Sequence, residues 1–530
     1  MRPISRLSAV LILALLSAGA ERSAAVDGEM KARIRVNAGK VVTEVNPMIY
    51  GHFIEHLGKC IRDGLWTPGA RGHELVLGGV RRDVFQAISE LQIPLLRWPG
   101  GCFADGYHWR DGIGQTHLRP VRKNQAWGGQ EDNLFGTDEF LKLCAELGIE
   151  PLINVNLGSG TAEEAREWVE YVNAPADTPP GSLRARNGRP APYRVRYWGI
   201  GNESWGAHEI GSFRRGRDYA EKYLSFHRAM KQADPAIKVM AVGALPPLID
   251  WNKEVLEAAA DSIDFLSLHI YFPSFIFPRK YKKKEDMYYG IVASGRKLEE
   301  LLEQFDADIR RYGGKNPDIR IALDEWNLWW DGQQIIRAED YELSSALFTA
   351  DVLARLQRWS DRVAFANFAQ LVNVLGAIIT DENSLFLTPS YLSFLLFRRH
   401  SGELLVESST DGPVFRNLEF GIVPPMSDNP LVECSATLDA AGGKLSLIVI
   451  NKHYDKPVET EIGIAGFPRA GAASVWEING DSPHAMNSFA EPDAVRIVEK
   501  TAVVSSDPFI YTLPPHSVTA IVLTRDNRRE

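Results

Sequence analysis

The sequence predicts an α/β protein: a (β/α)8 TIM barrel followed by a C-terminal antiparallel β-sandwich of jelly-roll-like type. Two patterns in its 530 residues lead to this expectation. Between residues 47 and 375, eight short apolar runs alternate with amphipathic stretches, as in a closed parallel sheet surrounded by helices. After residue 385 the chain changes to short alternating strands separated by Gly, Pro and Asp, which is typical of a sandwich.

Eight runs rich in β-branched and aromatic residues are the expected barrel strands. They cover residues 47–53, 94–100, 150–156, 194–203, 237–244, 262–272, 319–327 and 363–373. Segments between several of them, such as 81–92, 137–148 and 294–314, repeat apolar residues at helical spacing. Eight strand–helix units indicate a closed barrel, which we expect over residues 46–385.

The sandwich domain is expected over residues 386–530. Its clearest strand patterns are 443–454, 456–466, 472–480, 494–500 and 516–526. The early run 32–39 alternates in the same way but precedes the barrel. We therefore expect residues 26–45 to contribute an N-terminal strand or strands to the sandwich.

Residues 1–25 match a secretory signal peptide. Arg2 and Arg6 precede the apolar run 7–20, and cleavage after Ala20 or Ala25 would fit the small-residue rule. The run is short for a membrane span, and no later segment reaches the necessary length. The sequence thus predicts a secreted or periplasmic protein that has no membrane contact once the signal is removed.

Charge and cysteine content bear on the remaining classes of function. The formal net charge of −9 gives no indication of a nucleic acid or an anionic membrane as partner. The cysteines are scattered and lack metal-like spacing, so we expect them to be free or structural and expect no bound metal. They are Cys60, Cys102, Cys144 and Cys434.

Two glutamates stand at the ends of expected strands, on the face where such barrels carry their active sites. Glu203 follows the fourth strand in WGIGNESWG, and Glu325 ends the seventh in IALDEWN, 122 residues later (325 − 203). Only closure of the barrel brings these strand ends face to face. Opposed carboxylates are what glycoside hydrolysis requires, one to protonate the leaving oxygen and one as base or nucleophile. A distance of about 5 Å between the two carboxyl groups predicts retention of configuration at the sugar, and a distance of about 6.5–9.5 Å predicts inversion.

The motifs around these residues resemble the family 51 glycoside hydrolases, chiefly α-L-arabinofuranosidases. The matching stretches are VNPMIYGHFIEHLG (45–58), LLRWPGGCFADGYHW (95–109), WGIGNESWG (198–206), SLHIYF (267–272), DEWNLWW (324–330) and FANFAQLVN (365–373). The resemblance implies a barrel with a β-sandwich, a retaining two-step mechanism, no cofactor and an assembly such as a hexamer. The implied substrate is an arabinofuranosyl-containing oligosaccharide or polysaccharide from plants.

The resemblance also implies residue roles. Glu203 of the GNE motif would be the general acid/base, and Glu325 of the DEWN motif the nucleophile. The pKa of Glu203 is expected to be raised, because a general acid must stay protonated while Glu325 is ionised. Many polar groups around one sugar unit favour exo action. The expected substrate-binding residues are Glu55, Arg97, Cys102, Trp127, Asn202, His269, Tyr271 and Gln370.

Cys102 departs from the family pattern, because many relatives carry Asn at this position after the WPGG stretch. A thiol cannot donate and accept as an amide does, so both a pocket residue and a buried packing residue stay open. Trp205, Trp326, Trp329 and Trp330 are candidates for packing against a sugar ring, and some of them for the core.

Other functions compete with this interpretation. HFIEH (52–56) matches a zinc-protease pattern that requires a helix, but Pro47, Gly51 and Gly58 bracket it and favour a strand running into a loop. A glycan-binding protein without catalysis would have no use for two opposed glutamates. Among glycosidases, β-xyloside cleavage and endo-acting β-glucan cleavage are the alternatives.

Overall fold

The computed structural model describes residues 30–69, 74–245, 250–273, 283–314, 316–329 and 341–526. The signal peptide expected over residues 1–25 lies outside these ranges, as does Trp330. Among the described residues, no helix combines the length and the apolar composition that a membrane crossing requires.

Eight parallel strands close into a barrel in the order of the sequence, as predicted. The last strand pairs with the first, so that Asn367 lies opposite Gly51 and Ala369 opposite Phe53. All eight fall within or close to the expected runs. They are β2 (Gly51–Phe53), β5 (Leu95–Trp98), β8 (Glu150–Val155), β9 (Tyr197–Ile200), β10 (Lys238–Val242), β11 (Phe265–Pro273), β12 (Arg320–Trp329) and β13 (Val363–Ala369).

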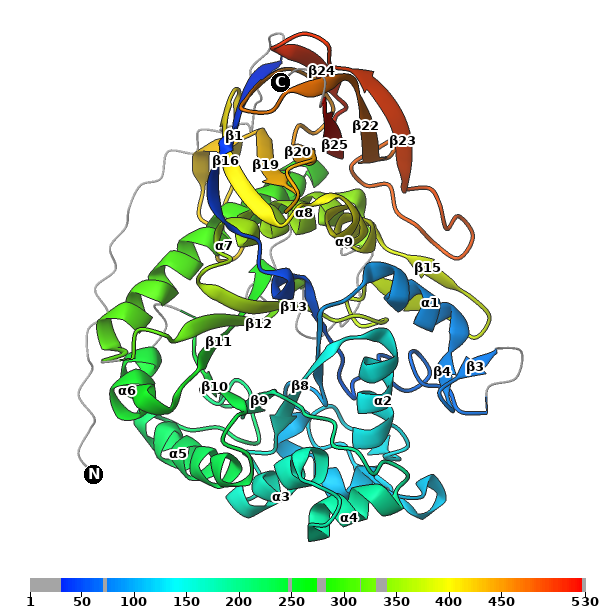
Figure 1. Ribbon diagram of the computed structural model, residues 1–530, viewed down its shortest axis with the longest axis vertical. Helices are drawn as coiled ribbons and strands as arrows, with labels where there is room; N and C mark the ends of the chain where they lie inside the picture. Colours follow the sequence, from blue (N-terminus) through cyan, green and yellow to red (C-terminus); the bar gives the residue numbers. More distant parts are fainter. Residues whose placement is uncertain are drawn as a thin grey trace, which may run out of the picture.

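Helices follow the strands and surround the barrel (Figure 1). They are α1 (Arg82–Leu91), α2 (Thr137–Leu147), α3 (Ala162–Asn173), α4 (Pro179–Arg186), α5 (Gly216–Ala233), α6 (Trp251–Ala259), α7 (Lys284–Tyr312), α8 (Leu343–Arg358) and α9 (Pro389–His400). Short strand pairs in the loops are β3 (Leu75–Val76) with β4 (Val80–Arg81), β6 (Arg122–Lys123) with β7 (Gln130–Glu131), and β14 (Ile378–Thr380) with β15 (Leu385–Leu387).

Helix α7 begins ten residues before the expected position 294 (294 − 284). Its first turns carry Tyr288 and Tyr289, which are both buried. The Tyr288 hydroxyl donates to the backbone oxygen of Lys452 at 3.2 Å, and the Tyr289 ring stacks on Phe415. Both partners belong to the C-terminal domain, so tertiary contact extends a helix whose own apolar periodicity is weak there.

A separate apolar cluster fills the barrel near the N-terminal ends of its strands. It contains Leu95, Leu152, Met240, Phe265 and Phe365 together with two alanines. Bulky side chains at this end close the interior, as is usual in such barrels. The polar residues at the opposite strand ends are therefore reached only from the C-terminal face.

The C-terminal domain is built on a nine-stranded sheet in the order β23-β22-β25-β20-β19-β16-β1-β21-β24. Between β16 and β19 in sequence, β17 (Val414–Asn417) and β18 (Met426–Pro430) form a separate antiparallel hairpin. The strands of the sheet are β1 (Lys31–Glu44), β16 (Leu404–Asp411), β19 (Val432–Leu438), β20 (Lys444–Asn451), β21 (Val458–Ala465), β22 (Arg469–Asn479), β23 (Arg496–Val503), β24 (Phe509–Leu513) and β25 (Ser517–Arg525).

Strand β1 lies inside this sheet, although it precedes the barrel in sequence (Figure 1). It runs antiparallel to β16 and parallel to β21, so the sheet is not purely antiparallel. Alternate residues of β1, among them Ile34 and Val36, are buried. Because α9 still packs on α1 and α8, we propose that the second domain begins near Gly402 rather than at residue 386.

Helix α8 joins the two domains through buried charges. Asp351 on α8 pairs with Lys452, directly after β20, at 2.8 Å and with Arg355 at 3.2 Å. All three side chains are almost fully buried. Removing one partner of a buried ion pair strongly destabilises the folded protein, because the other charge stays buried without compensation.

We expect Asp351→Ala to lower the free energy of unfolding by about 3–5 kcal/mol, because buried Lys452 loses its carboxylate. Urea unfolding followed by fluorescence measures the change. The matched control is Glu461→Ala, which breaks a partly exposed pair with Arg33 in the same sheet. That variant should lose only about 0–1 kcal/mol. Equal losses in the two variants would contradict the importance given to the buried pair.

Candidate active site

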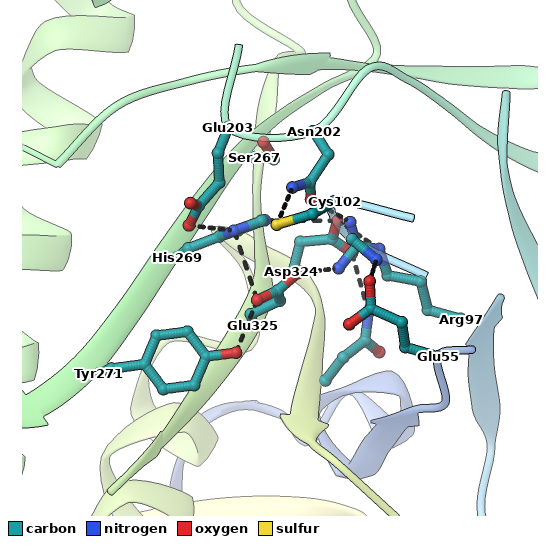
Figure 2. A network of polar contacts seen from close by, with 12 residues as sticks. Glu55, Arg97, Cys102, Asn202, Glu203, Ser267, His269, Tyr271, Asp324 and Glu325 are labelled. Atoms are coloured by element: carbon teal, nitrogen blue, oxygen red, sulfur yellow. Dashed lines mark hydrogen bonds and ion pairs between the residues drawn. The ribbon is translucent and has the colours of Figure 1, made fainter. Parts of the chain in front are cut away.

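The barrel brings the predicted site residues to one place, at and beyond the C-terminal ends of its strands. Figure 2 labels all of them except Trp127 and Gln370, which both contact Glu55. Arg97 lies in β5, His269 and Tyr271 in β11, and Glu325 in β12. The others follow strand ends: Glu55 after β2, Cys102 and Trp127 after β5, Asn202 and Glu203 after β9, and Gln370 after β13.

Glu203 and Glu325 face each other across the barrel, with the His269 ring beside both (Figure 2). One oxygen of each glutamate and one ring nitrogen of His269 all lie within 4.8 Å of one another. His269 Nδ1 is 3.0 Å from Glu203 Oε1 and 3.6 Å from Glu325 Oε2. The two carboxylates that the sequence pattern singled out therefore share one small volume.

Glu325 is fixed by a cation on one oxygen and a hydroxyl on the other. Arg97 donates to Glu325 Oε1 at 2.5 Å, and the Tyr271 hydroxyl donates to Oε2 at 2.6 Å. The same guanidinium pairs with Asp324 at 2.9 Å and donates to Asn202 Oδ1 at 2.8 Å. Contacts of this kind to both oxygens leave the carboxylate one orientation.

Glu203 is held by a strained turn and by two imidazoles. Its backbone has φ +39° and follows Gly201 at φ +85°, so the chain turns sharply where β9 ends. His269 contacts Glu203 Oε1 at 3.0 Å, and His208 Nε2 lies 3.4 Å from Oε2. The turn thus points the carboxylate at the pocket while both oxygens contact ring nitrogens.

The expectation of a raised pKa for Glu203 is wrong. Burial favours the neutral acid, but hydrogen bonds from His208 and His269 outweigh burial and lower the pKa of Glu203 to about 2. The pKa of His208 rises to about 10 through its contacts with Glu203 and Glu209. Burial lowers the pKa of His269, but the neighbouring Glu325, Asp324 and Glu203 raise it to about 10.

Glu55 organises the opposite wall of the pocket. Its Oε1 accepts from the backbone N–H of Gly101 at 3.0 Å and of Phe103 at 3.1 Å, and from the Trp127 indole at 3.0 Å. Gln370 donates to Oε2 at 3.2 Å. Burial and the nearby Glu325 raise the pKa of Glu55 to about 7. One carboxylate therefore positions a loop, an indole and an amide.

The paired glycines of the WPGG stretch allow this close packing. A Cβ on Gly100 would lie 2.7 Å from Glu55 Cγ, and one on Gly101 would lie 2.8 Å from Glu325 Oε1. Contacts this short would displace both carboxylates. Glycine is required here because two glutamates approach the backbone from opposite sides.

Cys102 lies in the pocket wall, which decides between the two readings left open for it. Its thiol donates to Glu209 Oε1 at 2.8 Å, and the same oxygen accepts from Asn202 Nδ2 at 3.1 Å. Burial and the neighbouring Glu209 raise the pKa of the Cys102 thiol well above its usual range. All four cysteines are free, so the thiol is retained.

The lining of the pocket contains both polar and apolar side chains. Arg97 and His269 are not among its lining residues; they lie behind the wall and contact the carboxylates. Among the tryptophan candidates, Trp329 lines the pocket and Trp326 is fully buried in the core. The apolar lining also includes Phe53, Leu57, Ala369, Val374 and Leu375.

Three polar residues of the site were missed by the reasoning from sequence. His208 and Glu209 follow the GNE motif in GAHEIG, and Asp324 directly precedes Glu325. A strand alternates its side chains, so Asp324 would be expected to point away from its neighbour. The only sequence clue to these three residues was the clustering of ionisable residues near each glutamate in the chain.

The HFIEH segment forms no zinc-binding helix. Residues Gly51–Phe53 are strand β2, and His52 and His56 face different surroundings. His52 packs on the Phe394 ring, whereas His56 pairs with Glu131 at 3.0 Å. The two imidazoles thus have different partners and do not face a common site.

Comparisons with known proteins agree with this site. Two family models match, the alpha-L-arabinofuranosidase 1 domain over residues 87–288 and the alpha-L-arabinofuranosidase C-terminal domain over residues 324–517. An intracellular exo-alpha-L-arabinofuranosidase of Bacteroides ovatus is 33% identical over 94% of this chain and 97% of its own. Alpha-L-arabinofuranosidase C of Emericella nidulans is 33% identical over 92% of this chain and 96% of its own.

Solved structures lead to the same family. An alpha-L-arabinofuranosidase of Thermotoga maritima, determined as an arabinose complex, superposes with a TM-score of 0.86 at 36% identity, over 93% of this chain and all of its own. The GH51 alpha-L-arabinofuranosidase of Thermotoga petrophila gives 0.85 at 37% identity with the same coverage. This chain is therefore a glycoside hydrolase of family 51, the α-L-arabinofuranosidases.

Proposed function

We propose that the protein is an exo-acting, retaining enzyme that releases terminal α-L-arabinofuranosyl residues from arabinose-containing plant oligosaccharides or polysaccharides. The approach of the two glutamates carries this proposal: one oxygen of each lies within 4.8 Å of the other. Retaining glycosidases hold their carboxyl groups about 5–5.5 Å apart, whereas inverting enzymes need about 6.5–9.5 Å to admit a water molecule.

Glu325 is proposed as the nucleophile. Arg97 and Tyr271 contact its two oxygens and hold in place the carboxylate that attacks the anomeric carbon. A bond forms between this carbon and a Glu325 oxygen while the bond to the leaving oxygen breaks. The resulting glycosyl-enzyme is an ester, and water cleaves it in the second step.

Glu203 is proposed as the general acid/base. In the first step its proton passes to the leaving oxygen, and in the second it takes a proton from the attacking water. The imidazoles of His208 and His269 favour its ionised form. His208 is the more exposed of them and also lines the pocket, so a leaving group can displace it from Glu203. Loss of that cationic contact raises the pKa of Glu203 and prepares it to carry a proton.

The arrangement of polar groups supports exo action on one sugar unit. Glu55, Asn202, Tyr271 and Gln370 line the pocket from four different strand ends. Hydrogen-bonding groups around a single unit reject sugars with misplaced hydroxyls, since buried partners would be left unpaired. The names of the relatives, exo-alpha-L-arabinofuranosidase in Bacteroides ovatus and an arabinose complex in Thermotoga maritima, support arabinofuranose as that unit.

We also propose that the protein is secreted or periplasmic. This rests on the signal-like pattern of residues 1–25. The Bacteroides ovatus relative is named intracellular. The hexamer implied by resemblance stays a prediction.

The proposed activity is tested with a panel of p-nitrophenyl glycosides. We expect kcat/KM for α-L-arabinofuranoside to exceed that for β-D-xylopyranoside or β-D-glucopyranoside by at least about a hundredfold, within the discrimination that hydrogen-bonded sites reach. NMR should show the α-anomer as first product. Preference for a glucoside, or for internal bonds of a β-glucan, would contradict the assigned specificity.

Glu325→Ala should lower turnover by orders of magnitude on every substrate, because no glycosyl-enzyme can form. Added azide should restore part of the activity and give a product of inverted configuration. Turnover near that of the unaltered enzyme would contradict the role.

Glu203→Ala is the matched control for this test. It should cripple hydrolysis of oligosaccharides far more than the first step with a dinitrophenyl leaving group, which needs no acid. Equal losses on both kinds of substrate would remove the distinction between the two glutamates.

His208→Gln tests the electrostatic control of Glu203. The His208 contact lowers the pKa of Glu203, so its removal raises that pKa. A general acid works only while protonated, and activity falls as pH rises through its pKa; the alkaline limb of kcat/KM should therefore move to higher pH. His108→Gln is the control, since it alters another imidazole–glutamate contact away from the pocket, with Glu164 at 2.9 Å. If the alkaline limb of the kcat/KM profile lay at the same pH in both variants as in the unaltered enzyme, the proposed displacement of His208 would be contradicted.

A further inference from the structure

A thiol, an imidazole and a carboxylate meet at the edge of the pocket, beside the catalytic pair. Cys102 Sγ lies 2.8 Å from Glu209 Oε1, and His208 Nε2 lies 3.3 Å from the same oxygen. One ligand atom from each of the three residues lies within 4.8 Å of the other two. The mechanism proposed above uses neither the thiol nor Glu209.

The second oxygen of Glu209 is a separate indication of a ligand. Glu209 is only 6% exposed, and its Oε2 has no hydrogen-bond partner among the described residues. A buried carboxylate oxygen without a donor carries the cost of its lost hydration. The other oxygen of this carboxylate, Oε1, faces Cys102 and His208, so a cation bound there would compensate the charge of the carboxylate.

We propose that Cys102, His208 and Glu209 bind a divalent cation of the zinc class, and that the bound ion inhibits hydrolysis. Thiolate, imidazole and carboxylate are the ligand types of protein zinc sites, and the thiolate selects against Ca²⁺ and Mg²⁺. The side chain of His208 is 54% exposed, so the ion can enter from solvent and keep water in a fourth position.

The exchange of protons for the ion preserves the local charge. A Zn–S bond forms as Cys102 releases its thiol proton, and a Zn–N bond forms as protonated His208 releases the proton on Nε2. Both protons go to solvent. Before binding, the imidazolium balances the Glu209 carboxylate; afterwards, the dication balances a thiolate and the same carboxylate. The summed charge of the three side chains before binding therefore equals that of the three side chains with the ion after binding.

Inhibition follows from the geometry and rests on the acid/base role proposed for Glu203. His208 Nε2 lies 3.4 Å from Glu203 Oε2, so an ion on this nitrogen takes His208 away from Glu203 and places a dication nearby. The ion stabilises the ionised form of Glu203 and opposes its protonation. It also binds to Cys102 in the pocket wall, where the sugar has to pass.

The experiment titrates the chelator-treated full-length enzyme with Zn²⁺ while it hydrolyses p-nitrophenyl α-L-arabinofuranoside. Cys102→Ser and Glu209→Gln should each raise the half-inhibitory zinc concentration by more than about a hundredfold, since even outer-shell changes cost 10–100-fold in metal affinity. Each variant is compared with its own metal-free rate. Binding is measured directly with Co²⁺, whose thiolate-to-cobalt charge-transfer absorption should appear in the unaltered enzyme and vanish in Cys102→Ser.

His108→Ala is the control, because His108 is another partly exposed imidazole beside a glutamate, but without a thiol. Its zinc response should match that of the unaltered enzyme. No charge-transfer band in the unaltered enzyme, or equal zinc sensitivity in all four proteins, would overturn the site. A band without loss of activity would overturn the inhibition. Failure of the proposed function is recognised separately, by normal turnover of Glu325→Ala without metal.

Discussion

Arg97 lies in the interior of the barrel, where a guanidinium is stable only if acceptors meet its donors. It contacts Asp324 and Glu325 on β12 and Asn202 beyond β9. One cation therefore ties β5 to two other parts of the barrel. The nucleophile proposed at Glu325 and the turn that carries Glu203 both depend on it, because Asn202 directly precedes that glutamate.

The barrel could be predicted from sequence because each strand was marked twice, by apolar residues and by a polar residue at its end. The C-terminal sheet was harder. Strands β16 and β19 were both missed. For β16, contacts far apart in the chain decide the pairing with β1, whereas β19 pairs mainly with the next strand, β20. The start of α7 was missed for the same reason, since Tyr288 and Tyr289 are buried against the other domain.

Sequence motifs located the site residues but not the contacts among them. The GNE and DEWN motifs placed Glu203 and Glu325 at the ends of strands β9 and β12, whereas the direction of the Glu203 pKa shift required the positions of His208 and His269. His208 lies in a loop, where no periodicity indicates where a side chain points. Electrostatic properties of a site depend on distances of a few ångströms, which a linear pattern does not contain.

The position of β1 gives the chain a particular order of assembly. Arg33 lies opposite Asp411, so the two partners are 378 positions apart in the chain (411 − 33). Until β16 and β21 leave the ribosome, β1 has two open edges that other chains or chaperones can bind. The barrel between them pairs its strands in sequence and can form earlier. Burial of β1 thus requires synthesis to have passed β21, and a product truncated before β16 keeps β1 as an unpaired strand.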